Sequence, residues 1–232
     1  VTLELMGLSA VALVALEAHA VAAATRYLLV GLLGSMLYLL GVGLLYALHG
    51  SVDLSDLAGK LQAEPAAWAA MALMSGGLLL KTALFPLHFW LPPAHANAPA
   101  PVSAVLSALV VKAAFYILLR LWLGPFDALA SPWIGQLLGM LGAGAVLWGS
   151  LQALLAPRLK LVVAYSTVAQ IGYLFLLFPF SGMHNAAAIA WYGGVWLALS
   201  HGLAKAGLFL AVGNLARRAR HDRIDGFERV VH

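Results

Sequence analysis

The chain has 232 residues, of which 63% are hydrophobic and only 9% are charged, whereas an ordinary soluble domain carries about 25% charged residues. This composition excludes a typical globular surface and indicates an integral membrane protein with several spans. The formal charge of +4 is too small to indicate a nucleic-acid partner, and the lack of cysteine excludes disulfides and thiolate metal or iron–sulfur sites held by this chain.

Apolar runs of about 20 residues recur along the chain and predict an all-α, polytopic transmembrane helix bundle of about seven spans. We expect these spans at 1–18, 26–48, 66–90, 102–123, 133–155, 159–180 and 186–215. The first run begins without methionine and is slightly short for a span, so we expect the sequence to start inside a helix and to be a fragment. Proline or glycine marks most of the short connections, which favours antiparallel neighbouring helices.

The distribution of basic residues predicts the orientation of the bundle, because cytoplasmic loops are enriched in lysine and arginine. The connections after even-numbered spans contain only Lys60 and Arg120. The remaining lysines and arginines of the connections follow odd-numbered spans: Arg26, Arg158, Lys160, Arg217, Arg218, Arg220, Arg223 and Arg229. The ends of the odd-numbered spans are therefore expected in the cytoplasm, and the polar segment 216–232 is expected to be a cytoplasmic charged tail or linker.

The third span contains Lys81, Pro86 and His88 in an otherwise apolar run. A lysine inside a membrane costs about 2.5 to 3.5 kcal/mol on insertion scales, so such residues are candidates for function. Pro86 is expected to break the helix and to free the carbonyl of Thr82, which is tolerated only where protein or water satisfies it. His88 is a candidate for proton exchange, although a hydrogen-bonded packing role is the alternative for a lone histidine. Snorkelling is the alternative for Lys81.

Lys112 lies near the middle of the fourth span, where snorkelling to the membrane surface is hardest. Desolvation opposes the charge of a buried lysine, and a nearby carboxylate favours it. A lysine whose carboxylate partner comes and goes can therefore alternate between charged and neutral forms. This property is required of a proton relay, and we interpret Lys112 as a relay residue.

Two further candidates, His201 and Lys205, are spaced i and i+4 on one face of the seventh expected span. Their small neighbours would also suit plain helix packing. Glu4 lies near the edge of the first run, where an interfacial carboxylate is the alternative to a functional one. A mildly polar stripe formed by Tyr165, Ser166, Thr167 and Gln170 is interpreted as bonding between helices, with a water-lined path as the alternative.

Several stretches match, in order and spacing, a known family of membrane proteins. The most specific is KTALFPLHFWLPPAHANAPAPVSAVLSALVVK at 81–112, supported by ELMGLSAVAL at 4–13, RLKLVVAYSTVAQIGY at 158–173 and LSHGLAKAGLFLAVGNL at 199–215. The chain thereby resembles the proton-conducting, antiporter-like subunits of respiratory complex I, of multi-subunit sodium/proton antiporters and of membrane-bound hydrogenases. One departure is Pro93, which stands where the family often has an acidic residue.

The resemblance implies a relay of buried side chains inside an inverted-repeat fold. It assigns Glu4 to the family's fifth helix, Lys81 to the broken seventh, Lys112 to the eighth, and His201 with Lys205 to the eleventh. It implies a transmembrane domain over 1–215, with the first repeat mostly in 1–123 and the start of the second in 132–215. The family's second broken helix is absent from this sequence.

The resemblance implies that the chain translocates protons, or a cation and protons, across a bacterial or archaeal inner membrane. It also implies that the chain does so together with other membrane subunits. A complex I-like, redox-driven assembly is preferred, and a standalone sodium/proton antiporter or a bicarbonate-uptake assembly is the alternative. No nucleotide loop, catalytic triad or metal spacing appears in the sequence, so neither a cofactor nor a catalytic centre of its own is expected. Haem between histidines and a non-conducting anchor are the remaining, less favoured interpretations.

Overall fold

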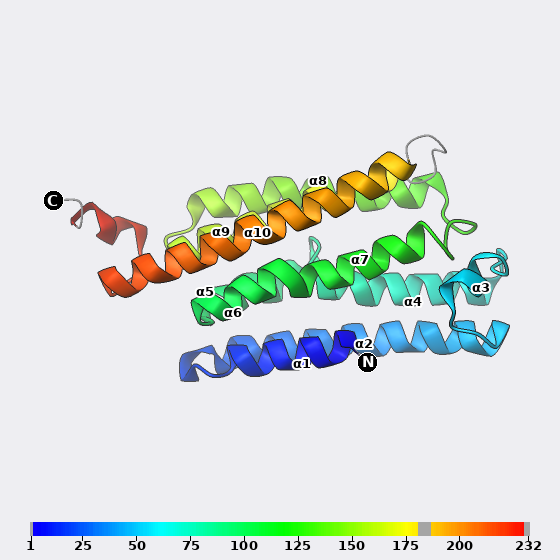
Figure 1. The fold of residues 1–232 in the computed structure, drawn as a ribbon, viewed down its shortest axis with the longest axis horizontal. Helices are drawn as coiled ribbons and strands as arrows, with labels where there is room; N and C mark the ends of the chain where they lie inside the picture. Colours follow the sequence, from blue (N-terminus) through cyan, green and yellow to red (C-terminus); the bar gives the residue numbers. More distant parts are fainter. Residues whose placement is uncertain (1, 181–186, 230–232) are drawn as a thin grey trace.

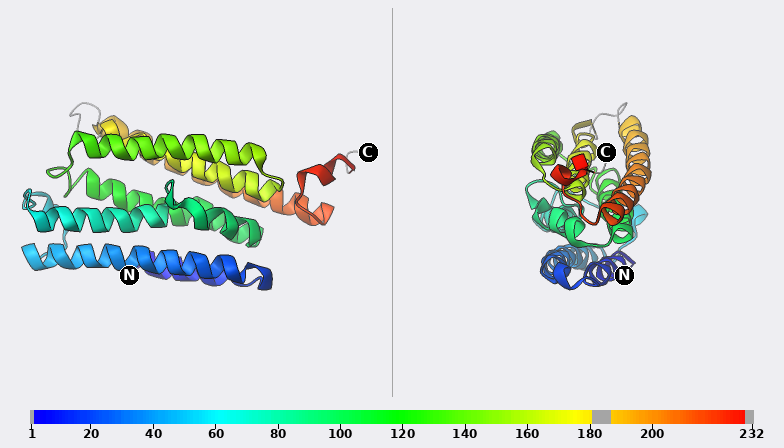
Figure 2. Two further views of the ribbon diagram at one scale, coloured as in Figure 1. Left: turned by 180° about the vertical axis from the view of Figure 1, so that it is seen from behind. Right: turned by 90° about the vertical axis from the view of Figure 1, so that its left-hand side faces the viewer.

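The computed structural model describes residues 2–180 and 187–229, and helices dominate these ranges (Figure 1). The α-helices are α1 Thr2–Val14, α2 Val21–His49, α3 Leu54–Ala58, α4 Pro65–Thr82, α5 Leu91–Asn97, α6 Ala100–Val105, α7 Val111–Trp122, α8 Pro132–Leu155, α9 Leu159–Phe175 and α10 Ala187–Ala219. Short 3₁₀ turns lie at Ala18–Ala20, Leu87–Trp90, Phe178–Phe180 and Ile224–Arg229, and a π-helical turn lies at Leu106–Val110. The long helices run nearly parallel to one axis (Figure 2).

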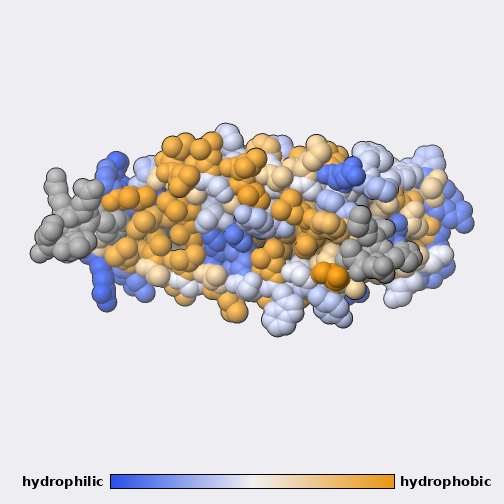
Figure 3. All heavy atoms as spheres, turned by 90° about the horizontal axis from the view of Figure 1, so that it is seen from above, coloured by the Kyte–Doolittle hydropathy of each residue, from blue (hydrophilic) through white to orange (hydrophobic). Residues whose placement is uncertain are grey.

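Within the described ranges, five helices are long and apolar enough to cross a membrane alone, and the bent pair α4–α5 makes a sixth candidate span. The all-helical, polytopic bundle with one broken helix is therefore confirmed. The first of the seven expected spans is present as α1, whose 13 residues extend only about 20 Å at the helical rise. Large apolar side chains are spread over the face in Figure 3, and hydrophilic residues gather mainly at its two ends, apart from one patch near the middle.

The connections with most of the basic residues lie at the same end of the bundle (Figure 1). This basic end contains the α1–α2, α5–α6 and α8–α9 connections and the segment after α10. The opposite end carries the connection around α3 and the one between α7 and α8. The structure thus brings to one end the loops whose charges predicted a cytoplasmic side.

Paired glycines allow α2 and α4 to pack with their backbones in close contact. A β-carbon on Gly77 would collide with the carbonyl oxygen of Gly34, and one on Gly34 would lie 2.8 Å from the carbonyl oxygen of Gly77. Small residues at such crossings are the usual means by which membrane helices approach each other. This close contact sets the distance of α4, and therefore of Lys81, from α2.

The broken helix bends by 41° between α4 and the segment Leu87–Asn97. It is interrupted near Pro86 as expected, but α4 already ends at Thr82, and Ala83 adopts a left-handed conformation with φ of 56°. The indole nitrogen of Trp90 donates to the carbonyl of Leu80 across the break at 3.0 Å. Protein groups therefore satisfy part of the interrupted backbone, as burial in a membrane requires.

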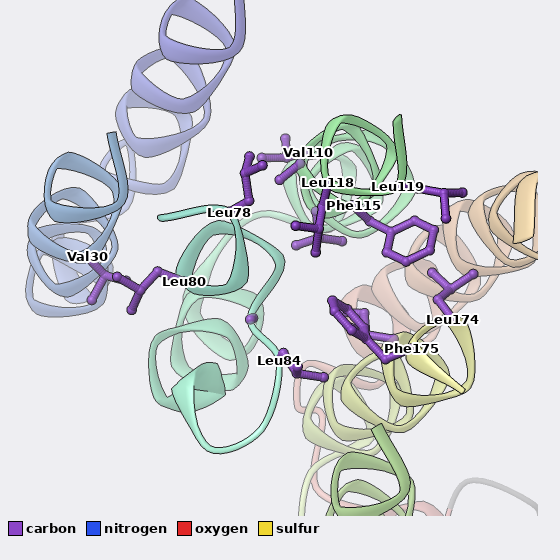
Figure 4. Close-up of a cluster of buried hydrophobic side chains, with 14 of the residues drawn as sticks. Val30, Leu78, Leu80, Leu84, Val110, Phe115, Leu118, Leu119, Leu174 and Phe175 are labelled. Atoms are coloured by element: carbon purple, nitrogen blue, oxygen red, sulfur yellow. The ribbon is translucent and has the colours of Figure 1, made fainter. Parts of the chain in front are cut away.

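The apolar core connects the two halves of the bundle. Figure 4 shows its side chains projecting from α2, α4, the break, the π-helical turn, α7 and α9 toward one another. The labelled members are Val30, Leu78, Leu80, Leu84, Val110, Phe115, Leu118, Leu119, Leu174 and Phe175. The broken helix is thus packed from both sides, which fixes the positions of the polar residues near its ends.

Candidate functional site

An ion pair joins the first helix to the end of α4. The ammonium of Lys81 lies 3.0 and 3.2 Å from the two carboxylate oxygens of Glu4. Ser35 of α2 donates its hydroxyl to the same carboxylate, and its oxygen lies 2.8 Å from the carbonyl oxygen of Gly31. The side chain of Lys81 is 10% exposed and that of Glu4 is 29% exposed. Three helices therefore contribute to one charged cluster, and a cavity of about 20 Å³ beside it has room for about one water molecule.

Lys112 is the second residue of α7, which follows the π-helical turn directly. The amide of Val111 donates to the carbonyl of Leu106, five residues earlier, and the widened turn exposes the carbonyl of Ser107 to the ammonium of Lys112. Single π-helical turns inside α-helices are frequent at functional sites. In this part of the molecule the turn supplies a buried acceptor for a buried cation.

Lys205 of α10 binds to the neighbouring helix α9. Its ammonium lies 3.0 Å from the carbonyl oxygen of Val163 and also donates to the hydroxyl of Ser166. His201 is buried on the same helix, and neither of its ring nitrogens has a hydrogen-bond partner among the described residues. The i and i+4 spacing therefore places the two residues on one face, but no hydrogen bond joins them there.

Two hydroxyls connect the sites of Lys112 and Lys205. The oxygens of Ser107 and Thr167 lie 3.1 Å apart, and Thr167 donates to the carbonyl of Val163 at 3.0 Å. Since Lys112 binds the carbonyl of Ser107 and Lys205 binds that of Val163, one buried polar network extends from α7 through α9 to α10.

The structure places His88 apart from both networks. Its ring stacks on Phe85 with centroids 5.5 Å apart, and its Nδ1 atom has no hydrogen-bond partner among the residues that the structure describes. Within residues 2–180 and 187–229, no hydrogen bond joins the Glu4–Lys81 cluster to the Lys112–Lys205 network. His88 remains a predicted link between them.

Ser35, Ser107 and Thr167 belong to these networks and were not among the predicted relay residues. The polar stripe that contains Thr167 was visible in the sequence, and its expected bonding between helices is present. Ser35 and Ser107 are isolated serines in apolar runs, and serine in a membrane helix commonly bonds to its own backbone. Their sequence signal was thus too weak to separate them from ordinary packing residues.

Lys112 also borders a large apolar groove between α1, α6, α7 and α10. The groove has a volume of about 880 Å³, and Lys112 is the one charged residue among those that line it in the described part of the chain. No group of three or more histidine, aspartate or glutamate side chains in residues 2–180 and 187–229 is arranged to hold a metal ion.

Comparison with known proteins identifies the family. The family model described as the transmembrane region of NADH:quinone oxidoreductase and Mrp antiporters matches residues 1–229. The chain belongs to this antiporter-like family. It is 39% identical to NADH-quinone oxidoreductase subunit N of Desulforudis audaxviator over 98% of its length, and 30% identical to subunit N of Herminiimonas arsenicoxydans over 97%. It covers 45% and 48% of those proteins and thus spans about half the length of these curated relatives.

Solved structures show the same antiporter-like architecture. An archaeal membrane-bound sulfane sulfur reductase contains a chain that matches 97% of this one with a TM-score of 0.87 and 30% identity. Complex I of Thermus thermophilus matches 88% with a TM-score of 0.68 and 34% identity, and the Mrp complex of a Dietzia species matches 85% with a TM-score of 0.75 and 32% identity. This chain covers 46%, 44% and 36% of those chains, respectively. All three relatives are parts of multi-subunit membrane complexes, and the antiporter-like chain is an integral membrane protein.

Proposed function

We propose that the antiporter-like chain translocates protons, or a cation and protons, across a membrane as part of a larger subunit in a complex I-like assembly. The observation that carries this proposal is the network from Lys112 through Ser107 and Thr167 to Lys205, buried between helices able to span a membrane. Ionisable groups inside membrane bundles mark ion paths and proton relays. Membership of the family supports the same reaction.

In the proposed mechanism, Glu4 controls the charge of Lys81. The carboxylate 3.0 Å away stabilises the ammonium form, and movement or neutralisation of Glu4 removes that stabilisation. The released proton passes through water and His88 to Lys112. The Lys112–Lys205 network then supplies a continuous series of acceptors and hydroxyls between these two lysines. His201 lies on the same face of α10 as Lys205.

The proposed organisation of the chain has a transmembrane part followed by a cytoplasmic segment. Residues 1–215 form the transmembrane part, with most of the first repeat in 1–123 and the beginning of the second in 132–215. Residues 216–232 are the cytoplasmic segment. The proposed partners are the lipid bilayer, the other membrane subunits of the assembly, and protons or Na⁺ as transported ions, in a bacterial or archaeal inner membrane.

Replacement of Lys112 by methionine in the full-length polypeptide, within its assembled complex, tests the relay. Methionine keeps most of the side-chain volume and removes the proton-carrying group. Because a positioned proton-transfer group accelerates its step by about 10²-fold or more, we expect ion pumping in inside-out vesicles to fall to near background. Proton uptake measured with a pH-sensitive dye reports the result.

The matched control is Lys60→Met, which removes a lysine that is exposed outside the bundle and pairs with Asp56. It should pump as the parent does. Quantitative recovery of the complex by native gel shows whether each variant assembles. Normal pumping by an assembled Lys112→Met complex would falsify the relay role.

The alternative assembly is a multi-subunit sodium/proton antiporter, which the match to the Mrp complex favours. The identity of the proteins that co-purify with the full-length polypeptide separates the two assemblies. Redox subunits and pumping that follows electron transfer support the complex I-like proposal. Sodium-dependent proton exchange without an electron donor supports the antiporter, and bicarbonate-dependent uptake would point to the third assembly.

A further inference from the structure

Three segments far apart in the sequence meet at the basic end of the bundle. The residues after α10 return to the α8–α9 connection, where the amide of Leu159 donates to the carbonyl of Asp222 at 2.8 Å and the amide of Ile224 donates to that of Pro157 at 3.0 Å. Arg158 and Arg223 form an isolated antiparallel β-bridge there. The segment after α10 is therefore fixed to the start of α9.

Side chains from this junction bind the third segment, the turn between α5 and α6. The guanidinium of Arg158 is held by Asp222, with Nε 3.0 and 2.8 Å from the two carboxylate oxygens, and its other nitrogen donates to the carbonyl of Ala96 at 3.0 Å. Lys160 donates to the carbonyl of Ala98 at 2.9 Å. The side chain of Asp222 is only 16% exposed, so the interaction is partly shielded from water.

The residue behind this junction is His95, which none of the contacts described so far uses. It is fully buried, and both ring nitrogens lack a hydrogen-bond partner among the described residues. Its ring stacks on Phe209 of α10 at 4.6 Å between centroids, and its carbonyl accepts from the hydroxyl of Ser103 at 3.1 Å. Buried polar atoms are nearly always paired, so an unpaired imidazole at this position calls for an explanation.

His95 is connected to one end of the Lys112–Lys205 network through the packing of Phe209. Phe209 follows Lys205 by one helical turn and packs in a small apolar cluster with Val163 and Ala104. The carbonyl of that same Val163 is the acceptor for Lys205. The α5–α6 turn, with His95 beneath it, therefore covers the network on the side of the basic end.

We propose that Arg158, Lys160 and Asp222 are positioning residues that hold the α5–α6 turn closed over His95 and over the basic end of the Lys112–Lys205 network. Opening of this clamp admits water to the imidazole, which has one donor and one acceptor nitrogen and can pass a proton between solvent and network. The role in ion movement rests on the function proposed above, whereas the closure itself does not.

Basic side chains also stabilise helix C-termini by binding the last carbonyls, and Ala96 and Ala98 lie at the end of α5. A local accessibility measurement distinguishes closure from general stabilisation. We would place a cysteine at the buried Ser103 of the full-length polypeptide in native membranes and measure its rate of labelling by a small methanethiosulfonate reagent. This chain contains no cysteine, and the parent without the new thiol gives the background.

Asp222→Asn and Arg158→Gln should each raise the labelling rate at position 103 by about tenfold, because they increase the population of the locally opened state. The conservative variant Asp222→Glu, which keeps a carboxylate to hold the guanidinium of Arg158, should retain slow labelling. The control Arg223→Gln removes the same charge from the neighbouring, largely exposed Arg223–Asp225 pair and should leave the rate unchanged. A second reporter at Ser75, buried on α4 and bound by Trp122, should label slowly in every variant.

Unchanged labelling in Asp222→Asn and Arg158→Gln would overturn the clamp, and equal increases at positions 103 and 75 would do the same by showing general loosening. In the assembled complex, Asp222→Asn should lower the number of ions moved per turnover relative to Arg223→Gln. An open turn with unchanged ion movement would overturn the positioning role. Failure of the relay itself is detected separately by Lys112→Met, since labelling does not depend on transport.

Discussion

Each lysine of the candidate site binds an acceptor: Lys81 and Lys205 bind groups on other helices, and Lys112 binds a carbonyl in the π-helical turn just before it. Lys81 has a carboxylate partner, whereas Lys112 and Lys205 bind carbonyls and a serine hydroxyl in the part of the chain that the structure describes. A charged amine without a carboxylate in a membrane is costly. The proposed relay has these two lysines lose and regain a proton and has the hydroxyls between them transmit it.

Thr167→Val tests this connection, because it removes the hydroxyl between Ser107 and Val163 and preserves the shape of the side chain. We expect slower ion pumping by the assembled complex and a loss of about 1 kcal/mol of stability from the missing buried hydrogen bond. Initial pumping rates in vesicles measure the first effect. Thr167→Ser, which retains the hydroxyl, should stay close to the parent, and equal pumping by the valine and serine variants would contradict a role for the hydroxyl.

At the scale of the elements, close helix packing and interrupted helices cooperate. The Gly34–Gly77 contact brings α4 against α2, so that Ser35 and Lys81 reach Glu4 together. The break after Thr82 then allows α5 to leave the axis of α4, and the π-helical turn before α7 exposes the carbonyl that Lys112 binds. The break after α4 lies beside Lys81, and the π-helical turn lies beside Lys112.

Gly77→Leu should force α2 and α4 apart, because a β-carbon at this position already collides with the backbone of α2. We expect a loss of about 1 to 3 kcal/mol, typical of an overpacked interior, together with reduced pumping as the Glu4–Lys81 pair separates. Thermal unfolding of the full-length polypeptide in detergent measures the stability. Gly76→Leu is the matched control, since a β-carbon there meets nothing within 4 Å, and a comparable loss in the control would argue against the close contact as the cause.

The whole molecule has a basic end and an opposite end, and this polarity predicts its orientation in the membrane. The α5–α6 turn, the α8–α9 connection and the segment after α10 share the basic end. Lysine and arginine are retained on the cytoplasmic side of membranes. We therefore expect the proposed clamp and the basic end of the Lys112–Lys205 network to face the cytoplasm.

Cysteines at two exposed positions test this orientation without changing a basic residue. Ala18 lies in the α1–α2 connection at the basic end, and Gln62 lies before α4 at the other end. A membrane-impermeant maleimide added to intact cells should label Gln62→Cys and should reach Ala18→Cys only after the membrane is opened. The reverse pattern would show that the bundle is inserted in the opposite direction.

Local composition and short motifs were enough to predict the helical, membrane-spanning character, the broken third span, the family, and the positions of Lys81, Lys112 and Lys205. Hydropathy counts apolar residues along the chain and does not depend on which helices touch. The sequence did not reveal that Ser107 bonds to Thr167 or that Asp222 binds Arg158, because the members of each pair are about 60 residues apart in the chain. Only the packing of α7, α9 and α10 decided those contacts, since a hydroxyl or a carboxylate acquires its partner from the helices beside it in space.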